Sequence, residues 1–375
     1  MGEAMRPGNE AELAEAVRGA NGPLRIVGGG TRGIGRVGVS EVLDVSGLSG
    51  ISLYEPGALT LVAGAGTPLA EVQAVLAEQR QRLAFEVPDL RRLLGRSGAS
   101  TLGGVVAVNA SGPRRVQVGA CRDALLGVRF VDGAGVVVKN GGRVMKNVTG
   151  YDLVKLMAGA HGTLGVLAEV AFKVQAVPEA EATLVSGPLE ASAAVAAMAV
   201  GLTSPFDVSG AAWNSRAMVR VEGMAGSVAY RAGELVKRLP GFEVVTGEAS
   251  AALWAGVRDV TAFADAPGVV WRVVVKPSDA PHVLAALHDR PHRAVMDWGG
   301  GLIWLLMDGG ADILRAAVTR LGGHATVVRG HAVVPVFHPE PAAVAVLTAG
   351  LRAKFDPRGI FNPGMFGPGS FGGVA

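Results

Sequence analysis

The sequence predicts an α+β protein made of two regions with different textures. Its 375 residues include 55 glycines, and apolar residues make up 49% of the chain against 18% for charged residues, which is enough to bury sizeable cores. In the first region, short apolar runs end in glycine-rich loops, as expected of strands that lead into tight turns. From about residue 179, Ala-rich helical segments alternate with strand-like segments, a pattern typical of an α+β domain with an antiparallel sheet.

Composition and charge exclude several classes of protein. The glycines follow no Gly-X-Y period, and the apolar content is too high for a disordered chain. No run of about 18 uncharged apolar residues predicts a membrane-spanning helix, and residues 1–20 lack the apolar segment of a signal peptide. The 35 basic and 32 acidic residues nearly cancel without forming a long basic stripe, so we expect no nucleic-acid partner. The single cysteine, Cys121, excludes a disulfide framework and a thiolate zinc site and indicates a reducing compartment.

The first region begins with a helix and a strand. Asn9 and Glu12 have the spacing of a capping box, which predicts a helix through residues 13–17. Pro23 leads into an apolar run at residues 24–27, which we expect to be a strand. Further along we expect, in order, strands at residues 41–45 and 59–63, a helix from residue 67 to about 79, a hairpin of residues 125–131 and 136–139, a short helix at 152–157 and a strand at 163–174.

Pro178 is expected to mark a domain boundary, because the texture of the chain changes after it. The second region predicts helices at residues 189–200, 228–239 and 313–321 and strands at residues 269–275, 302–307 and 325–328. All five tryptophans, from Trp213 to Trp304, lie in this region. A helix near residues 341–354 follows, and the tail is rich in glycine and proline.

The strand at residues 24–27 runs into the segment Val27-Gly28-Gly29-Gly30-Thr31-Arg32. Three consecutive glycines allow backbone N–H groups to converge without interference from Cβ atoms, which favours a concave anion-binding loop suited to a pyrophosphate. A simple tight turn is the alternative. No Gly-Lys-Ser/Thr follows, which excludes a P-loop, and no clear helix follows Gly33, so the segment departs from a Rossmann fingerprint and NAD fits it poorly.

A second glycine-rich segment, Thr101-Leu102-Gly103-Gly104, lies at the expected start of a helix. Backbone donors at such a position can face a phosphate. The alternative is that Gly103 and Gly104 allow the helix to pack closely against its neighbours. Two such segments in one region together favour a ligand that contains phosphate.

Five motifs in a fixed order span nearly the whole chain. They are Gly-Gly-Gly-Thr at residues 28–31, Thr-Leu-Gly-Gly at 101–104, Gly-Tyr-Asp-Leu at 150–153, Gly-Thr-Leu-Gly-Val at 162–166 and Phe-Asn-Pro-Gly at 361–364. In this order they resemble the FAD-binding family of vanillyl-alcohol oxidase and p-cresol methylhydroxylase. Finer motifs resemble a narrower family, the E-type subunits of bacterial glycolate oxidases. They include Gly-Pro-Arg-Arg at residues 112–115, Val-Met-Lys-Asn-Val at 144–148, Trp-Arg at 271–272, Asp-Trp-Gly-Gly at 297–300 and Gly-Gly-His-Ala-Thr at 322–326.

The resemblance implies an FAD-binding domain of two α+β subdomains with an α+β cap domain over the flavin. It implies that residues 1–178 form the FAD-binding domain, split near residue 56, that residues 179–340 form the cap, and that residues 341–375 return to the FAD-binding domain. It also implies FAD contacts at Val27, Gly28, Gly29, Gly30, Thr31, Arg32, Ser97, Gly98, Thr101, Gly103, Gly104, Gly162, Gly165, Val166 and Asn362. Some members attach the flavin covalently. No histidine precedes His161, and Cys121 matches no attachment position, so we expect non-covalent FAD.

A function and partners follow from the same resemblance. We expect the FAD-binding subunit of a glycolate oxidase-type complex, which oxidises glycolate or a similar 2-hydroxy acid to the 2-oxo acid and passes electrons to partner subunits. The expected partners are a companion D-type flavoprotein subunit and an iron–sulfur F-type subunit. The expected location is the cytoplasm, with peripheral association to the inner face of the cell membrane through these partners left open. Two alternatives remain, a self-contained FAD-dependent hydroxy-acid dehydrogenase and a scaffold subunit with weak or lost FAD.

Candidates for catalysis are few. His324 could face the flavin or be structural, Arg115 could bind an acidic substrate or form a surface ion pair, and Tyr151 could orient a ligand or pack in the core. Relatives often have Gly-Ser-Glu-Gly where this chain has Gly-Ala-His-Gly at residues 159–162. Related 2-hydroxy-acid dehydrogenases also carry a His-x-Gly-Asp-Gly-Asn-x-His pattern suited to metal and carboxylate binding, which is absent here. We therefore expect no metal site. We also expect poor glycolate oxidation by the chain alone, with Arg272 or Arg115 left to hold a carboxylate.

Overall fold

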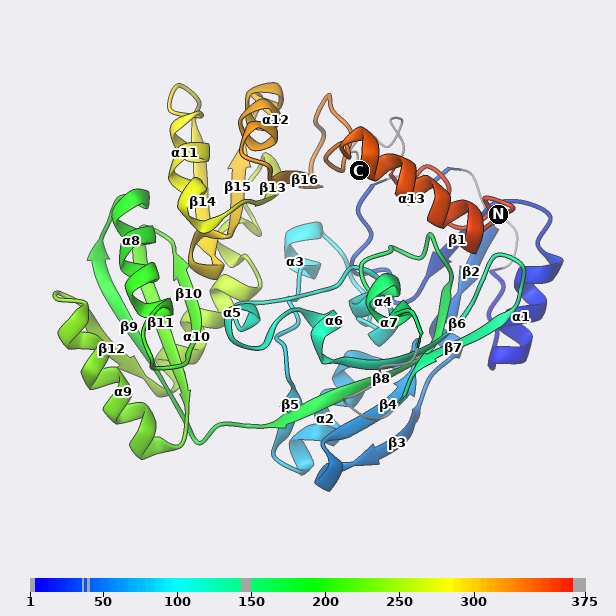
Figure 1. Cartoon of the computed structure of the whole chain (residues 1–375), viewed down its shortest axis with the longest axis horizontal. Coiled ribbons are helices and arrows are strands. Elements are labelled where there is room, and N and C mark those ends of the chain that lie inside the picture. The colour runs from blue at the N-terminus through cyan, green and yellow to red at the C-terminus, as the bar shows by residue number, and fades with distance from the viewer. Residues whose placement is uncertain (1–3, 36, 39–40, 143–149, 367–375) are drawn as a thin grey trace.

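The computed structural model describes residues 4–35, 37–38, 41–142 and 150–366. Two large sheets lie toward opposite ends of the longest axis of the molecule, and the chain first crosses between them after Ala176 (Figure 1). Pro178 lies in this crossing. The Val-Met-Lys-Asn-Val motif at residues 144–148 lies outside the described residues.

The chain opens with α1 (Glu10–Gly19) and the parallel strands β1 (Leu24–Val27) and β2 (Glu41–Asp44). The expected helix cap is confirmed, because the Asn9 side-chain oxygen accepts from the Glu12 N–H at 2.9 Å and the Asn9 amide donates to the Glu12 carboxylate at 2.6 Å. Leu13 of α1 packs with Leu24 of β1 in a core that also contains Phe361. The C-terminal segment is therefore part of this N-terminal unit.

The next sheet has six strands and one buried face. Its path is β3 (Ile51–Glu55), β4 (Thr60–Gly64), β8 (Val166–Ala176), β6 (Leu125–Val131) and β7 (Val137–Gly141), with β5 (Gln81–Leu83) paired to the end of β8. Apolar side chains of α2 (Leu69–Glu78), α4 (Leu102–Ala107), α6 (Cys121–Ala124) and α7 (Leu153–Met157) pack on it. The expected β6–β7 hairpin is confirmed. Strand β3 is not among the strands expected from the sequence, and it pairs with β4 across residue 56, where a subdomain boundary is expected.

An eight-stranded antiparallel sheet follows, as the sequence predicts. In spatial order its strands are β12 (Glu243–Thr246), β9 (Ala180–Pro188), β11 (Arg216–Gly223), β10 (Val208–Trp213), β14 (His292–Asp297), β15 (Leu302–Met307), β13 (Val269–Val274) and β16 (His324–Arg329). Strands β13, β15 and β16 match the sequence-based expectations. Strands β9, β10 and β11 were not expected, because small and polar residues within them weaken the apolar pattern that marks a strand.

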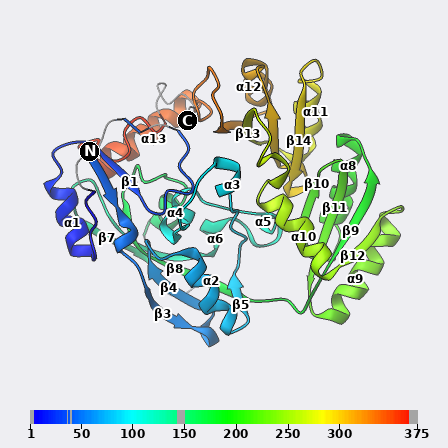
Figure 2. The same ribbon diagram turned by 180° about the vertical axis from the view of Figure 1, so that it is seen from behind.

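Helices cover both faces of the eight-stranded sheet. Helices α8 (Ala191–Leu202) and α9 (Ala225–Arg238) pack on one face, and α10 (Gly247–Arg258) packs on the other (Figures 1 and 2). Neighbouring residues of β11 set the two faces, since Val219 packs with α9 and Met218 packs with Trp254 of α10. Helices α11 (Ala280–Ala285) and α12 (Ala311–Arg320) extend the layer of α8.

A network of ion pairs joins the two large sheets. Arg220 pairs with Glu86 at 2.9 Å, while Glu222 pairs with Arg82 at 2.8 Å and with Arg114 at 3.2 Å. Although burial opposes ionisation of Glu222, the three neighbouring arginines lower its pKa to about 2. Because each charge in the network has an opposite partner, the network ties β11 to the region around β5.

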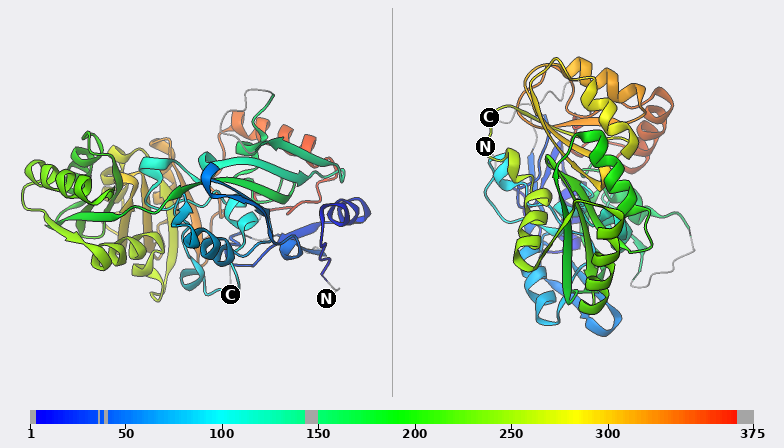
Figure 3. Two further views of the ribbon diagram at one scale, coloured as in Figure 1. Left: turned by 90° about the horizontal axis from the view of Figure 1, so that it is seen from below. Right: turned by 90° about the vertical axis from the view of Figure 1, so that its left-hand side faces the viewer.

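The C-terminal segment runs along the outside of the molecule before it returns to β1. Helix α13 (Ala342–Phe355) has no buried residue, and its Val346 and Leu347 side chains are 72% and 69% exposed (Figure 3). After α13, Phe361 forms a parallel bridge with Leu24. This bridge brings the residue that follows it, Asn362, to the end of β1.

Candidate functional site

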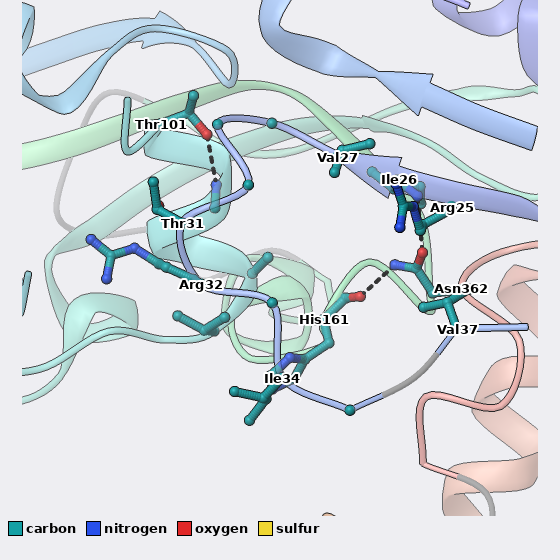
Figure 4. Close-up of a pocket in the computed structure, with 18 of the residues that line it drawn as sticks. Arg25, Ile26, Val27, Thr31, Arg32, Ile34, Val37, Thr101, His161 and Asn362 are labelled. Atoms are coloured by element: carbon teal, nitrogen blue, oxygen red, sulfur yellow. Dashed lines mark hydrogen bonds between the residues drawn. The ribbon is translucent and has the colours of Figure 1, made fainter. Parts of the chain in front are cut away.

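Two adjoining cavities of about 330 and 80 Å³ lie between the loop after β1, helix α4 and the loop before β8. Figure 4 shows residues that line the larger one. Ile26, Gly28, Gly104, His161 and Asn362 line both cavities, so the two form one groove. The walls of this groove come from segments that lie far apart in the sequence. The motifs at residues 28–31, 101–104, 162–166 and 361–364 therefore meet around one space.

The glycine loop after β1 packs its backbone against a second loop. A Cβ at Gly28 would lie 2.5 Å from Thr101 Oγ1, and a Cβ at Gly29 would lie 1.5 Å from the carbonyl oxygen of Ala99. Gly28 and Gly29 are therefore required for contact between the two loops. Gly30 has φ +67°, and a Cβ there would have no neighbour within 4 Å among the described residues. Gly30 thus provides the left-handed turn that carries the backbone along the wall of the groove.

The Thr-Leu-Gly-Gly motif forms the first turn of α4. Thr101 is the N-cap, and its Oγ1 accepts a hydrogen bond from the Gly104 N–H at 3.4 Å (Figure 4). A Cβ at Gly103 would lie 2.9 Å from the carbonyl oxygen of Ala65, so Gly103 permits the close packing considered as an alternative. A Cβ at Gly104 would lie 3.3 Å from Thr101 Oγ1, with no other described neighbour within 4 Å. Space for a ligand therefore begins directly at the backbone of Gly104.

Asn362 joins three segments around the groove. Its Nδ2 donates to the carbonyl oxygen of His161 at 2.8 Å, and its Oδ1 accepts from the Ile26 N–H at 2.9 Å (Figure 4). Its own N–H donates to the carbonyl oxygen of Leu24 at 2.9 Å. A Cβ at Gly162 would lie 2.9 Å from Asn362 Nδ2, so this glycine allows the loop before β8 to approach the amide. The structure thus brings together the predicted site residues Gly162 and Asn362.

The arginines that line the groove differ in their partners. The Arg32 guanidinium donates to the Pro88 carbonyl oxygen at 2.7 Å and to Ser100 Oγ at 2.8 Å, and it points away from Asn362 (Figure 4). Arg25 and Arg96 also line the groove, and neither guanidinium has a hydrogen bond or ion pair within the described part of the chain. These two cations are available to a ligand, and the sequence reasoning missed both. For Arg96, its position directly before the predicted contact Ser97 is the signal that could have identified it.

The remaining predicted contacts divide into two groups. Val27, Thr31 and Gly165 line the groove, whereas Ser97, Gly98 and Val166 line neither of its cavities. Gly98 has φ +115°, and a Cβ there would lie 2.6 Å from the Gly29 carbonyl oxygen, so it supports the glycine loop from behind. Val166 is buried in the core that contains Val131.

His161 lines both cavities and was not among the predicted contacts. Its backbone has φ +53°, and its ring packs edge-on against Phe337 and Phe366, with centroids 5.2 and 5.4 Å away. Burial, with a smaller contribution from the charge of Arg272, lowers the pKa of His161 to about 4. The imidazole is therefore uncharged at neutral pH. The histidine in Gly-Ala-His-Gly is the sequence signal for this position.

Tyr151 does not reach the groove. Its side chain is 89% exposed, so the expectation that it could pack in the core is wrong, and it lines neither cavity. The neighbouring Asp152 caps α7 by accepting from the Lys155 N–H at 3.1 Å. The Tyr-Asp pair therefore has a capping role that is visible in the structure.

Arg115 and His324 come together although they belong to distant parts of the chain. Arg115 begins the short helix α5 (Arg115–Val118), and its Cζ lies 4.5 Å from the centroid of the Trp298 ring. His324 begins β16, and burial followed by the charges of Arg272 and Arg115 lowers its pKa. The structure thus places two of the three catalytic candidates near Arg272.

Cys121 and the histidines of the described residues do not form a metal site. No three histidine, cysteine or carboxylate side chains gather there to form a group that could hold a metal ion. The thiol of Cys121 is fully buried, which raises its pKa, and it lies in the core of the six-stranded sheet. No helix in this part of the chain is long and apolar enough to cross a bilayer.

Comparison with known proteins places these observations in a family. Residues 4–141 match the family model described as the FAD binding domain. The chain is 36% identical to glycolate oxidase subunit GlcE of Escherichia coli (strain K12), over 91% of this chain and 92% of that protein. It is 38% identical to glycolate oxidase subunit GlcD of Bacillus subtilis (strain 168), over 23% of this chain and 18% of that protein.

A solved structure supports the fold separately. The structure of an alkyldihydroxyacetonephosphate synthase matches with a TM-score of 0.67 and 15% identity, over 96% of this chain and 76% of that chain. At this identity the likeness concerns the fold alone. It confirms the FAD-binding α+β fold with a second antiparallel sheet that the motifs imply.

Proposed function

Because the chain belongs to the family of FAD-linked oxidoreductases that contains glycolate oxidase subunit GlcE, we propose that it is the FAD-binding subunit of a glycolate oxidase-type complex. The observation that carries this proposal is the groove, where four family motifs from distant parts of the chain meet. The complex oxidises glycolate or a similar 2-hydroxy acid to the 2-oxo acid. FAD, when bound, supplies the two-electron acceptor, while the chain binds and orients it.

The residues of the groove fit the parts of FAD in order. The backbone of residues 28–31 and the first turn of α4 would hold the pyrophosphate through N–H donors, because the backbones of Gly30 and Gly104 border open space while Gly28 and Gly29 let the two loops pack together. Arg96 and Arg25 supply positive charge to the pyrophosphate. Arg32 does not, because its guanidinium donates to the Pro88 carbonyl oxygen instead. Gly162, Gly165 and Asn362 would hold the cofactor at the other part of the groove, and Ser97, Gly98 and Val166 would act by supporting its walls.

FAD is held without a covalent bond. The Cys121 thiol lies in the core rather than in the groove, and the His161 ring is packed between two phenylalanines. Denaturing the purified protein should therefore release a soluble flavin that runs as FAD. Flavin that stays with the precipitated chain would contradict this assignment and would make His161 the first attachment residue to test.

The proposed function assigns a role to each of the three parts into which the motifs divide the chain. Residues 1–178 form the FAD-binding domain, residues 179–340 form a cap, and residues 341–375 return to the FAD-binding domain. The bridge between Leu24 and Phe361 and the ion pairs of Glu222 support a fixed placement of these parts. A cap that is held in place can keep water from the flavin.

Electrons leave this subunit through partners. The single cysteine leaves the chain without the thiolates that an iron–sulfur cluster needs, so we assign that role to an F-type iron–sulfur subunit and assign a D-type flavoprotein as the second partner. The complex lies in the cytoplasm, and any contact with the inner face of the cell membrane is made through these partners. Purification of the tagged chain from its native cell, with identification of partners and measurement of flavin content, tests this assignment. A chain that purifies alone with a full complement of FAD would contradict it.

A second candidate function is a self-contained dehydrogenase. Two arginines over one ring, Arg115 and Arg272, favour it, because such a pair could hold an acidic substrate, and their charges add to burial in lowering the pKa of His324. Steady-state turnover by the isolated chain would support this second function. A colourless purified protein would instead support a scaffold role.

A further inference from the structure

Two arginines from different parts of the chain lie over the ring of Trp298. It lies in the turn after β14 and has φ +56°, and its Nε1 donates to the carbonyl oxygen of Gly112 at 3.0 Å. The Cζ atoms of Arg115 and Arg272 lie 4.5 and 5.4 Å from the centroid of the Trp298 ring. Since both lie on one ring, the two guanidinium carbons are within about 10 Å of each other.

Neither of these guanidinium groups forms an ion pair with a carboxylate of the described residues. Within the described residues, no hydrogen bond or ion pair is made by the side chain of Arg115 or Arg272, and both side chains are half-buried. Burial, followed by the charge of Arg115, lowers the pKa of Arg272 to about 10. Arg220 shows the contrasting arrangement, because its buried guanidinium pairs with Glu86. Two unpaired, partly desolvated cations that repel each other are costly unless an anion joins them.

Arg272 is linked to the groove through His161. Arg272 is close enough to lower the pKa of His161, which lines both cavities. His324 is near both arginines, which lower its pKa as well. Because both histidines are disfavoured from taking a proton, the guanidinium groups are the positive charges that an anion would meet.

We propose that Arg115 and Arg272 form a binding site for the carboxylate of a small 2-hydroxy or 2-oxo acid. The planar guanidinium matches a carboxylate through paired N–H donors, and stacking on Trp298 holds its plane while the N–H edges remain free. The bound anion offsets the repulsion between the two cations. The identity of the acid rests on the proposed function, whereas binding of an anion does not.

Calorimetric titration with oxalate tests the site. Oxalate is a two-carbon dicarboxylate with no C–H bond that a flavin could oxidise, so it stays intact during the measurement. The full chain is titrated at constant ionic strength set by sodium chloride, with its FAD content recorded, and is compared with Arg115→Gln and Arg272→Gln. The matched control is Arg293→Gln, because Arg293 is also stacked on a ring, 5.4 Å from the centroid of Phe263.

We expect saturable binding at one site, at least tenfold weaker in both variants and unchanged in the control. Absence of saturable binding to the wild-type chain, or wild-type affinity in both variants, would overturn the proposal. Should Arg272→Gln fail to fold, Arg272→Lys keeps the charge but loses the paired donors and should still weaken binding. Oxalate binding by a chain without FAD would count against the proposed function alone, and FAD binding without oxalate binding would count against this site alone.

Discussion

Asn362 and His161 are 201 residues apart in the sequence and are joined by a hydrogen bond of 2.8 Å from the Asn362 amide to the His161 carbonyl oxygen. The same amide group accepts from the Ile26 N–H. One buried side chain thus holds together the C-terminal segment, β1 and the loop before β8, and all three line the groove. The C-terminal segment is therefore a wall of the site and contributes to its shape.

Asn362→Asp should separate the two hydrogen bonds of this side chain. The carboxylate can still accept from the Ile26 N–H but can no longer donate to the His161 carbonyl oxygen, which it repels. We expect a loss of about 1–3 kcal/mol in the free energy of unfolding and a clear fall in FAD per chain. Thermal unfolding and flavin absorbance measure the two effects. Asn214→Ala, at an exposed position, should change neither, and a normal FAD content in Asn362→Asp would refute the role given to Asn362.

Gly104→Leu should fill the groove without straining the backbone. Gly104 lies in α4 without a positive φ, and a Cβ there would have one described neighbour within 4 Å, Thr101 Oγ1 at 3.3 Å. Because leucine favours a helix over glycine by up to about 1 kcal/mol, we expect the variant to fold and to lose most of its FAD. The matched control is Gly233→Leu in α9, a helical glycine far from the groove, where a Cβ meets no described neighbour within 4 Å. Equal FAD content in the two variants would show that the groove is not the FAD site.

Gly29 is less suitable for this test. The sequence alone suggests Gly29→Val, compared with Gly233→Val, on the ground that a Cβ would displace the backbone from a pyrophosphate. In the structure that Cβ would lie 1.5 Å from the Ala99 carbonyl oxygen. FAD should still be lost, but through disruption of the two loops themselves, which the Gly104 variant avoids.

Arg96→Gln should weaken FAD binding by roughly tenfold or more, because it removes a cation that has no protein partner among the described residues and that faces the proposed pyrophosphate. Arg92→Gln is the neighbouring control, since Arg92 pairs with Asp265 in an exposed ion pair. Titration of the FAD-free chain with FAD gives both affinities. Similar affinities in the two variants would remove Arg96 from the site.

Arg32 was a predicted FAD contact but bonds to other protein groups, whereas Arg96 was not predicted and lines the groove without a described partner. The glycines of the site could be predicted from the sequence, and the arginines could not. Glycines that must approach another backbone, such as Gly29 and Gly103, are visible in sequence because only glycine fits there. The sequence gives no comparable signal for arginines, since a long guanidinium side chain can reach many partners and only the tertiary fold determines which partner it contacts. Strands follow the same logic, because the apolar β15 was predicted correctly while β10, rich in small residues, was missed.

Asp297→Asn should stabilise the protein at alkaline pH. Asp297 is 2% exposed, and burial raises its pKa from 3.8 to about 8. The folded state therefore keeps a proton that the unfolded state loses, so the contribution of Asp297 to stability falls as the pH rises from about 4 to 8. Asparagine cannot ionise and can still accept from the Trp298 N–H, which lies 2.7 Å from Asp297 Oδ1.

Denaturant unfolding at pH 5 and pH 8 measures this effect. We expect the variant to gain on the order of 1 kcal/mol or more over the wild type at pH 8, with a smaller gain at pH 5. Glu222 and His161 have lowered pKa values, so their contributions make the free energy of unfolding fall in acid, opposite to the trend of Asp297. Comparing the variant with the wild type at the same pH cancels these contributions. Asp308→Asn, on the surface, is the control. A difference that does not change with pH would show that Asp297 is ionised in the folded state.

The isolated chain should oxidise glycolate poorly even when loaded with FAD. Oxidation of a 2-hydroxy acid needs a base within hydrogen-bond reach of the hydroxyl as well as a cation for the carboxylate. Arg115 and Arg272 can serve as the cation, but Tyr151 is exposed away from the groove, and burial lowers the pKa of His161 to about 4, which makes its imidazole a weak base. We therefore assign substrate oxidation mainly to the D-type partner and a relay or supporting role to this FAD.

Anaerobic mixing of the FAD-loaded chain with excess glycolate measures this directly through the visible absorbance of the flavin. Because general-base catalysis contributes about 10²–10⁴-fold, we expect bleaching at least about 100-fold slower than turnover of the complete complex. Dithionite added afterwards should bleach the flavin fully, which shows that the cofactor can be reduced. Rapid and complete bleaching by glycolate would overturn the assignment. It would point to a neutral imidazole as the base, and His324 would then be the first residue to replace, followed by His161, which lines the groove and is uncharged at neutral pH.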